Sequence, residues 1–516
     1  MPVKCLIKPS EYHDSVSLML VARELAKMSG VSDAAVVMAT EANKAILREA
    51  GLLTDDAQKA NPNDMVIAVT ASDILVVEQA LEEADRLLHK KSEQDRVGEY
   101  RARTLRGAAK ANPDANVAVI SVAGRYAAKE AWDALHMGLH VLLFSDNVSI
   151  EDEILLKQYA VEHGLLLMGP GAGTAILNGV ALGFANVIPP GPVGIVSAAG
   201  TGLQEVSTLL AKRGTGITQG IGTGGRDLKE AVGGLMMMAG LQALQDDPAT
   251  TVIVMVSKPP ASRVAQKVLH QAAQSSKPTV ACFLGGDFSG YEPGANVRFA
   301  NTLEEAASLA ACLAIGEPLH GAAASADIDS QAASLRKRIQ PGQRYLRGLF
   351  SGGTLCYEAQ VVWRELLPEV VHSNAPLDDT ARLIESNISQ VHTVLDLGEE
   401  EFTVGRPHPM IDNDLRIRRL LREASDPQVA VIMLDVVLGF GAHPNPLSEL
   451  AHAIRKARSL AAQNNCEPVF IASVTGTEAD PQRLSLQVAA LEEAGVIVCD
   501  SNAAAARLAA HVLRAI

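Results

Sequence analysis

A duplicated turn is the feature of this 516-residue sequence that most restricts its fold. Residues 197–205 read SAAGTGLQE, and residues 350–358 read FSGGTLCYE. In both places a short apolar run precedes the turn and a helix-like pattern follows it. A shift of 153 positions (353 minus 200) superposes three pairs of identical residues, which are Gly200 and Gly353, Thr201 and Thr354, and Glu205 and Glu358.

Three further landmarks recur in the same order in both halves of the chain. They are a glycine–arginine turn, an Asp-Pro dipeptide ahead of a strand, and a strand that begins just after a proline. The repeated order predicts two copies of one flavodoxin-like domain. The landmarks lie at 224–227, 247–248 and 278–283 in the first half, and at 405–409, 426–427 and 468–473 in the second half.

Short β-branched runs alternate with amphipathic helical patterns along almost the whole sequence. Apolar strands separated by helices are typical of parallel sheets that are covered on both faces. We therefore predict an α/β fold, in which a Rossmann-like domain is followed by two flavodoxin-like parallel-sheet domains. The predicted strands are 34–38, 65–69, 117–122, 140–144, 193–197, 252–256, 279–283, 430–434 and 469–473.

Proline- and glycine-rich breaks set the predicted domain boundaries. The break NVIPPGP at 186–192 separates the N-terminal region from the first repeat, and the charged stretch 81–110 is expected to be an exposed helical connector. The predicted parts are an N-terminal region at 1–190, a first repeat domain at 191–315, a linker at 316–345 and a second repeat domain at 346–516.

Charge and cysteine usage exclude several classes of protein. A formal net charge of -14 without a basic stripe argues against binding to nucleic acid. The six cysteines form no CxxC pair, so we expect no metal site and a reducing compartment. The sequence has no secretory signal and no 18-residue apolar run, so we expect a cytoplasmic protein that does not engage a membrane.

The two repeated turns have the composition of an anion site. Glycine lets the backbone approach a ligand closely, and a helix N-terminus presents unpaired N–H groups at its positive dipole end. The alternative is a plain strand–helix turn capped by threonine. Two related copies favour the anion site, because pseudo-twofold packing would aim both helices at one phosphate. The expected phosphate-binding residues are Ser197, Gly200, Thr201, Gly202, Ser351, Gly353 and Thr354.

Basic side chains in glycine- or proline-rich turns are the candidates for catalysis. A guanidinium after a run of glycines suits a phosphate or carboxylate, and the alternative is a solvated arginine. An imidazole in such a loop can act as an acid, a base or an anion donor, and the alternative is an ordinary loop histidine. The four candidates are Arg226 in GTGGRD, Arg406 and His408 in GRPHPMID, and His443 in GFGAHP.

Motifs along nearly the whole chain carry a resemblance to a known family. The order of the SxxGT turn, the GGRD turn and the proline-led strand resembles the α subunit of succinyl-CoA synthetase. The complete chain resembles the FdrA family, in its YahF-like branch. The matching motifs are DSVSLM (14–19), FSDNVS (144–149), TGGRDL (223–228), SKPPA (257–261), GGTLC (352–356), GRPHPMID (405–412) and LDVVLGFG (434–441).

The resemblance implies that the Rossmann-like domain is of the CoA-binding type. SVAGRYAA at 121–128 and the turn at 169–174 are similar to that domain of succinyl-CoA synthetase. The family's Gly-Pro-Asp-Cys-Gly-Thr turn is GPGAGT in this chain, so two side chains are replaced. The resemblance implies cofactor contacts at Ser145, Asn147, Gly169, Gly171, Gly173 and Thr174.

The resemblance also implies an activity. Related acyl-CoA synthetases pass phosphate from an acyl phosphate to a histidine in a Gly-His-Ala-Gly turn and then to a nucleotide. The corresponding segments here, 283–299 and 472–485, contain no histidine. The FdrA family includes a subunit of oxamate carbamoyltransferase, and carbamoyl phosphate is itself an acyl phosphate.

The function expected from this resemblance is a subunit of a carbamoyltransferase-type enzyme that acts on carbamoyl phosphate or a ureide such as oxalurate. Its ligands would be an acyl or carbamoyl phosphate and phosphate, and separate protein subunits would complete an oligomeric enzyme. No cofactor is required in this scheme, which leaves open whether CoA or a nucleotide binds in addition. The alternatives are an NDP-forming acyl-CoA synthetase subunit and a non-catalytic metabolite-binding scaffold.

Overall fold

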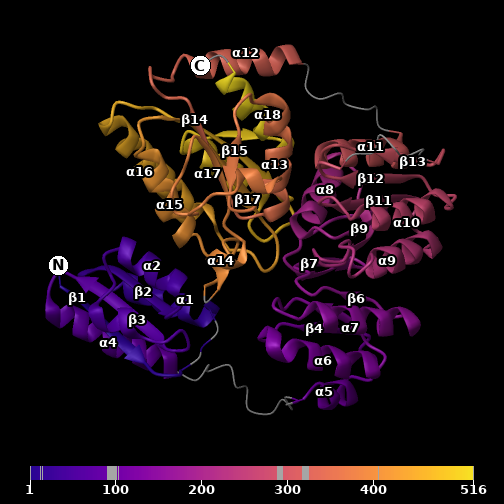
Figure 1. Cartoon of the computed structure of the whole chain (residues 1–516), viewed down its shortest axis with the longest axis horizontal. Coiled ribbons are helices and arrows are strands. Elements are labelled where there is room, and N and C mark those ends of the chain that lie inside the picture. Colours follow the sequence, from indigo (N-terminus) through magenta and orange to yellow (C-terminus); the bar gives the residue numbers. More distant parts are fainter. Residues whose placement is uncertain are drawn as a thin grey trace. The chain divides into compact units, whose positions relative to one another are not determined.

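The computed structural model describes residues 2–11, 13, 15–89, 102, 104–286, 294–316, 325–404 and 406–514 (Figure 1). The chain divides into two compact units. The first unit comprises Met1–Tyr100 and Leu397–Leu415, and the second comprises Arg101–Asp396 and Arg416–Ile516. None of the helices in the described ranges combines the length and apolar character that a membrane crossing needs.

The first unit contains a three-stranded sheet in the order β1-β3-β2. Helices α1 and α4 cover one face of this sheet, and α2, α3 and the segments beside them cover the other. The short helix α14 also belongs to this unit. The elements are β1 (Val3–Lys8), α1 (Ser15–Ala26), β2 (Val31–Met38), α2 (Glu41–Glu49), α3 (Asp55–Lys59), β3 (Met65–Ala71), α4 (Ile74–His89) and α14 (Glu400–Thr403).

The direction of these strands corrects the sequence-based prediction. The segments 34–38 and 65–69 were expected in a parallel sheet, but β3 pairs antiparallel with both β1 and β2. The prediction was wrong because β3 is covered on both faces, so its residues are almost all apolar. A continuous apolar run is the usual mark of a parallel strand, yet it reports burial on two faces rather than strand direction.

The second unit begins with a small parallel sheet in the order β4-β5-β6. Helices α6 and α7 pack on it with a core rich in alanine and leucine. This arrangement agrees with the Rossmann-like domain expected in the N-terminal region. The elements are α5 (Leu105–Ala111), β4 (Val117–Ile120), α6 (Gly124–His136), β5 (His140–Leu143), α7 (Ile150–Glu162) and β6 (Leu167–Met168).

The first repeat builds a seven-stranded sheet in the order β13-β12-β11-β9-β10-β7-β8. Its five strands from β9 onward are parallel, and the hairpin of β7 and β8 joins the edge antiparallel. The elements are β7 (Thr174–Leu177), β8 (Val180–Gly183), β9 (Pro190–Ser197), α8 (Gly200–Lys212), β10 (Ile217–Gly222), α9 (Leu235–Asp246), β11 (Val252–Ser257), α10 (Ser262–Ala273), β12 (Thr279–Phe283), β13 (Val297–Phe299) and α11 (Leu303–Ile315).

The second repeat builds a six-stranded parallel sheet in the order β15-β16-β14-β17-β18-β19. The predicted linker 316–345 contains α12, and its residues 317–324 lie outside the described residues. The elements are α12 (Ser325–Arg336), β14 (Tyr345–Phe350), α13 (Gly353–Leu366), β15 (Val371–Ser373), η1 (Asp379–Ala381), β16 (His392–Asp396), α15 (Asp414–Ala424), β17 (Val429–Val437), α16 (Leu447–Gln463), β18 (Val469–Thr475), α17 (Leu484–Glu493), β19 (Ile497–Cys499) and α18 (Asn502–Leu513).

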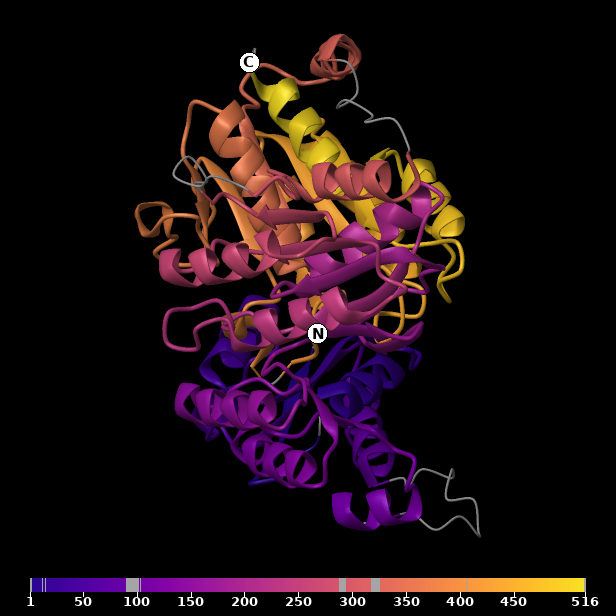
Figure 2. The same ribbon diagram turned by 90° about the vertical axis from the view of Figure 1, so that its right-hand side faces the viewer.

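The two sheets share one topology, which confirms the predicted pair of flavodoxin-like domains. With the β7–β8 hairpin set aside in the first sheet and β15 in the second, both sheets give the strand order 2-1-3-4-5. Helix α8 of the first repeat packs against α13 of the second, and α11 lies beside α18 (Figure 2). The helices that open after the duplicated turns therefore meet where the two repeats join.

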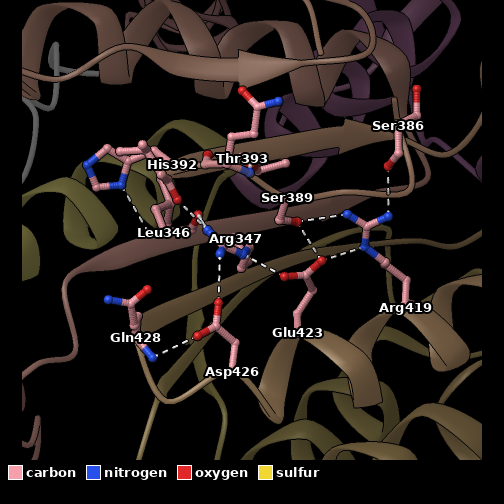
Figure 3. Close-up of polar contacts among 12 residues, drawn as sticks. Leu346, Arg347, Ser386, Ser389, His392, Thr393, Arg419, Glu423, Asp426 and Gln428 are labelled. Atoms are coloured by element: carbon pink, nitrogen blue, oxygen red, sulfur yellow. Dashed lines mark hydrogen bonds and ion pairs between the residues drawn. The ribbon is translucent and has the colours of Figure 1, made fainter. Parts of the chain in front are cut away.

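A buried ionic cluster fastens α15 to the sheet of the second repeat (Figure 3). Glu423 accepts a hydrogen bond of 2.6 Å from Nε of Arg347 in β14 and one of 2.5 Å from Nε of Arg419. Ser389, in the segment before β16, donates to Glu423 at 2.6 Å and accepts from Nη2 of Arg419 at 2.8 Å. The arginines also donate to backbone carbonyls and to Asp426, so the buried charges are satisfied within the protein.

Candidate functional site

The N-terminal end of α8 is buried and has open hydrogen-bonding capacity. Its N-cap residue, Ala199, has no side chain able to accept a hydrogen bond from the helix. Within the part of the chain that the structure describes, no acceptor is bound to the backbone N–H groups of Gly200, Thr201 and Gly202. A buried helix end normally has partners for these groups, so three unpaired amides mark a place that suits an anion.

Three glycine-rich turns converge beside this helix end. A Cβ at position 222 would lie 2.1 Å from the carbonyl oxygen of Thr174, and one at position 224 would lie 2.6 Å from that of Pro170. A Cβ at position 200 would lie 3.3 Å from Oγ1 of Thr174. Glycine is needed at 222 because the backbones pack this closely. The turns 169–174, 198–202 and 222–225 therefore form one locality.

The expected cofactor contacts lie in and beside the 169–174 turn. Gly169, Gly171, Gly173 and Thr174 belong to the turn beside α8, where Oγ1 of Thr174 donates to the carbonyl oxygen of Phe184 at 2.7 Å. Ser145 follows β5 and touches the same turn, because its carbonyl oxygen accepts from the Gly171 N–H at 3.1 Å, while its Oγ accepts from the backbone N–H of Val122 at 2.9 Å. Asn147 follows with a positive φ of 58°, in the loop that packs on the start of α6.

Ser197 is engaged by its own turn. Its Oγ donates to the carbonyl oxygen of Ala199 at 2.8 Å and accepts from the Ala199 N–H at 3.0 Å. These bonds fix the backbone just before α8 and leave the helix amides unpaired. Ser197 therefore shapes the turn. The groups that remain open to an anion are the backbone amides of residues 200–202.

The equivalent end of α13 already holds a carboxylate. Asp435 accepts hydrogen bonds of 2.7 Å from the backbone N–H groups of both Ser351 and Gly352, and Ser351 Oγ lies 3.1 Å from both carboxylate oxygens. Arg416 donates to the same carboxylate at 3.0 Å. Asp435 is fully buried, so this group is a permanent part of the turn. Ser351, expected to bind phosphate, instead binds this carboxylate.

Strand register explains why the two repeats differ here. Leu349 of β14 pairs with Leu434, and its counterpart Val196 of β9 pairs with Met255. Asp435 accordingly stands where the first repeat has Val256. A second carboxylate is close as well, because a Cβ at position 353 would lie 2.5 Å from Oδ2 of Asp396. Two negative groups beside α13 disfavour a phosphate near Gly353.

The two helix ends touch each other. The backbone N–H of Thr354 donates to Oγ1 of Thr201 at 3.2 Å, and a Cβ at position 202 would lie 3.0 Å from Cγ2 of Thr354. The expected convergence of the turns is thus present, but threonine side chains occupy the space between them. The geometry favours one anion site, at α8, over a site shared by both helices.

Arg226 serves a buried ionic network. Its Nε lies 2.8 Å from Oε2 of Glu153, and its side chain is 40% exposed. Glu153 also pairs with Lys157, which pairs in turn with Asp227 at 2.8 Å. Asp227 accepts from the first amides of α9. Arg226 therefore holds α7 against the 223–227 turn while part of its guanidinium remains at the surface.

The three remaining candidates are each engaged by local contacts. His443 is buried, accepts from the Asn445 N–H through Nδ1 at 3.0 Å, and has Nε2 3.7 Å from Glu449, so it carries its proton on Nε2. Arg406 and His408 belong to the first unit. Arg406 donates to Asn43, and the Nδ1 of His408 accepts from the Met410 N–H at 3.2 Å. Gly405 lies outside the described residues.

Sequence reasoning missed two groups near the paired helix ends. Asp435 is a charged residue inside an apolar strand, and such a residue needs a buried partner, which is a usable signal. Lys258 follows β11, and its Nζ lies 5.4 Å from the centre of the Tyr357 ring on α13. Cys356 is a poor nucleophile there, because burial raises the pKa of its thiol well above the ordinary value.

Family models match most of the chain. Residues 1–104 match the AllF heavy metal-associated domain, residues 190–285 match the CoA binding domain, and residues 349–512 match CoA-ligase. The last two matches coincide with the two repeats. Among the described residues, no group of three or more His, Cys, Asp or Glu side chains is arranged to hold a metal ion.

Three known proteins that are similar to the chain illustrate the range of its likeness. YahF of Escherichia coli strain K12 is 46% identical over 97% of both chains. The succinate–CoA ligase α subunit of Methanothermobacter thermautotrophicus is 28% identical, and the match covers 34% of this chain and 58% of the relative. The acetyl-coenzyme A synthetase 1 of Ca. Korarchaeum cryptofilum, solved with phosphate and ADP, is 16% identical over 78% of this chain and 82% of that one, with a TM-score of 0.31.

The chain belongs to the same family as YahF, the FdrA/AllF-like proteins that are related to succinyl-CoA synthetase. Its fold is that of a CoA-binding and CoA-ligase protein. The match to the named succinate–CoA ligase spans little more than half of that relative's length.

Proposed function

We propose that this chain is a subunit of an acyl-CoA-ligase-type enzyme that binds the phosphoryl group of an acyl phosphate at the N-terminal end of α8. The observation that carries the proposal is the set of three unpaired, largely buried amides at Gly200, Thr201 and Gly202. Membership of a family related to succinyl-CoA synthetase supports the same reading.

The helix end suits a departing phosphate. When the thiolate of CoA attacks the acyl carbon, the bond from that carbon to the bridging phosphate oxygen breaks and phosphate leaves with the electron pair. Amides already aimed at this group stabilise the developing charge without reorganising, and the helix dipole adds to the effect. The products are an acyl-CoA and inorganic phosphate, so the step needs no oxidant or metal.

In this reaction no histidine of this chain is phosphorylated. The segments 283–299 and 472–485 contain none, and the structure describes only part of the first of them. A nucleotide-binding partner subunit would have to supply any transfer from the nucleotide. Separate subunits and an oligomeric enzyme are therefore part of the proposal.

A carbamoyltransferase is the second candidate, and the lack of histidine in these segments favours it. Carbamoyl phosphate presents the same phosphoryl group, so the α8 end would bind it in the same way. An amine or amide nitrogen would then replace the CoA thiolate as the attacking group. Phosphate would leave as before.

Paired assays separate these functions. The purified chain, alone and with co-purified partner subunits, is mixed with acetyl phosphate and CoA or with carbamoyl phosphate and a ureide-forming amide. Release of phosphate that depends on CoA supports the ligase reading, and release that depends on the amide supports the carbamoyltransferase reading. Phosphate binding without any acceptor-dependent release would contradict both enzymes and leave a binding scaffold. Radiolabelled ATP is expected to leave no phosphohistidine on this chain.

A further inference from the structure

Two buried glutamates at equivalent positions cap helices across the junction between the repeats. Glu205 of α8 accepts from the backbone N–H of Asn502, the first residue of α18, at 3.0 Å. Glu358 of α13 accepts from the backbone N–H of Leu303, the first residue of α11, at 2.7 Å. Each repeat therefore supplies the carboxylate that caps a helix of the other repeat.

Asn502 joins the two carboxylates. Its Nδ2 donates to the second oxygen of Glu358 at 2.7 Å and to the carbonyl oxygen of Leu355 at 3.0 Å. The second oxygen of Glu205 accepts from Thr475 at 2.5 Å. Glu205, Glu358 and Asn502 are all buried, so the two acids share one solvent-inaccessible pocket with the amide between them.

The charges around this pocket do not neutralise two carboxylates. Glu205 on α8 and Glu304 on α11 act on the charge of Glu358, Glu358 and Glu305 act on the thiol of Cys282 in β12, and Arg507 on α18 lies next to Glu304. The cation among them, Arg507, forms an ion pair with Glu304. Burial is the largest influence on Glu358, and together with Glu205 it raises the pKa of Glu358 to about 8.

A protonated Glu358 has a hydrogen-bond acceptor within reach. Oδ1 of Asn502 is buried, and none of the described residues forms a hydrogen bond with it. A carboxamide can rotate to present either its oxygen or its nitrogen. A protonated Glu358 would then donate to Oδ1 of Asn502 and still accept from the Leu303 N–H through its other oxygen, and the bond from Nδ2 to the Leu355 carbonyl would be lost.

We propose that Glu205 and Glu358 form a proton-controlled latch between the two repeats. With one carboxyl group protonated, the pocket carries a single charge and both helix caps are kept. Loss of that proton puts two negative charges into the buried pocket, and the contact between α13 and α18 loosens. Because α8 and α13 also open after the duplicated turns, the latch couples protonation to the junction beside the proposed anion site.

The chain contains a built-in probe of this contact. Trp363 of α13 is fully buried, and its Nε1 donates to the carbonyl oxygen of Ala506 in α18 at 2.9 Å. The other tryptophan of the two in the sequence is Trp132. A Trp132→Phe variant of the full chain therefore reports the α13–α18 contact through Trp363 fluorescence alone.

The experiment titrates this variant from neutral to alkaline pH while circular dichroism confirms that the fold is kept. We expect a red shift of Trp363 emission with a midpoint at a pH of about 8. Adding Glu358→Gln should remove the transition and hold the emission at its neutral-pH value. Adding Glu205→Gln should move the midpoint to lower pH, because the neighbouring charge that disfavours ionisation is gone. Glu365→Gln, an exposed site on the same helix, is the matched control and should leave the midpoint unchanged.

Three outcomes would overturn the latch. They are no transition in the Trp132→Phe parent, an unaltered transition after Glu358→Gln, or an unaltered midpoint after Glu205→Gln. If Glu358→Gln does not fold, the latch is tested by Glu205→Gln alone, whose transition midpoint must then lie at a lower pH than that of the parent. The readout needs no phosphate, so its result is independent of the proposed function.

Discussion

Thr201 and Thr354, the equivalent threonines of the two repeats, are joined by a hydrogen bond of 3.2 Å from the backbone N–H of Thr354 to Oγ1 of Thr201. The contact brings the ends of α8 and α13 together, as expected from the duplicated turns. It is not symmetric, since the reciprocal bond from Thr201 N–H to Thr354 is absent from the described residues. The amide left open by this asymmetry belongs to α8, where we place the anion.

Replacing Thr201 by valine tests the structural part of this relationship. Valine keeps the shape of threonine but removes the acceptor for the buried Thr354 N–H. Leaving one buried donor unpaired costs about 1–3 kcal/mol of unfolding free energy. Chemical denaturation of the variant should show a loss in this range, whereas Thr201→Ser, which keeps the hydroxyl, should retain most of the stability. Equal stability of the valine and serine variants would show that the bond contributes nothing.

Asp435→Asn tests whether the carboxylate at α13 is structural. The change deprives Arg416 of its buried ion-pair partner and weakens the acceptor for the Ser351 and Gly352 amides. Removing one partner of a buried pair costs about 3–5 kcal/mol. The melting temperature should therefore fall, while phosphate affinity at α8 should stay within about twofold, a difference of less than about 0.5 kcal/mol. A phosphate affinity that rises with Asp435→Asn would place the anion at α13 instead, because the change removes a negative charge that repels phosphate there.

Glu423→Gln tests the ionic cluster of the second repeat (Figure 3). The substitution leaves the buried guanidinium groups of Arg347 and Arg419 without their shared carboxylate. We expect a loss of about 3–5 kcal/mol in unfolding free energy. Glu492→Gln, at an exposed position on α17, serves as the control and should change stability by less than about 0.5 kcal/mol. A loss no larger than in the control would mean that the cluster does not stabilise the fold.

The same carboxylate predicts how stability depends on acid pH. Burial alone would raise the pKa of Glu423, but Arg419 and Arg347 outweigh it and hold the pKa below the ordinary 4.5. A group with a lowered pKa stabilises the fold above its unfolded-state pKa, and this contribution is lost as pH falls through the folded-state pKa. Unfolding free energy should therefore decline below a pH of about 4.5, with a shallower decline in Glu423→Gln. Identical slopes in the two proteins would contradict the assignment.

Local patterns were enough to predict the repeats but not every sheet. The Gly-Thr turns gave the correct starts of α8 and α13, because a strand, a tight turn and a helix are encoded by neighbouring residues. The prediction of strand direction in the first unit was wrong. Helices α2 and α3 bury the second face of β3, so its residues are apolar on both faces. No local pattern in β3 distinguishes that situation from a parallel strand.

The candidate site depended on contacts that are distant in sequence. Asp435 reaches the Ser351 amide across 84 residues, and Arg406 reaches Asn43 across 363. A glycine-rich turn predicts free amides, but it cannot say whether a remote carboxylate will occupy them. The sequence therefore predicted both helix ends as anion sites, and only the fold separates the open end of α8 from the occupied end of α13.

Titration calorimetry with inorganic phosphate tests the central claim most directly. The full chain should bind one phosphate, and Gly200→Val should weaken binding at least about tenfold, or about 1.4 kcal/mol, because its side chain would enter the space between α8 and Thr174. Gly353→Ala, the matched site of the second repeat, should retain the affinity, although its melting temperature should fall because the new Cβ would lie 2.5 Å from Oδ2 of Asp396. Melting curves check that both variants fold. Absence of phosphate binding in the parent chain, or equal binding by the parent and Gly200→Val, would contradict the account.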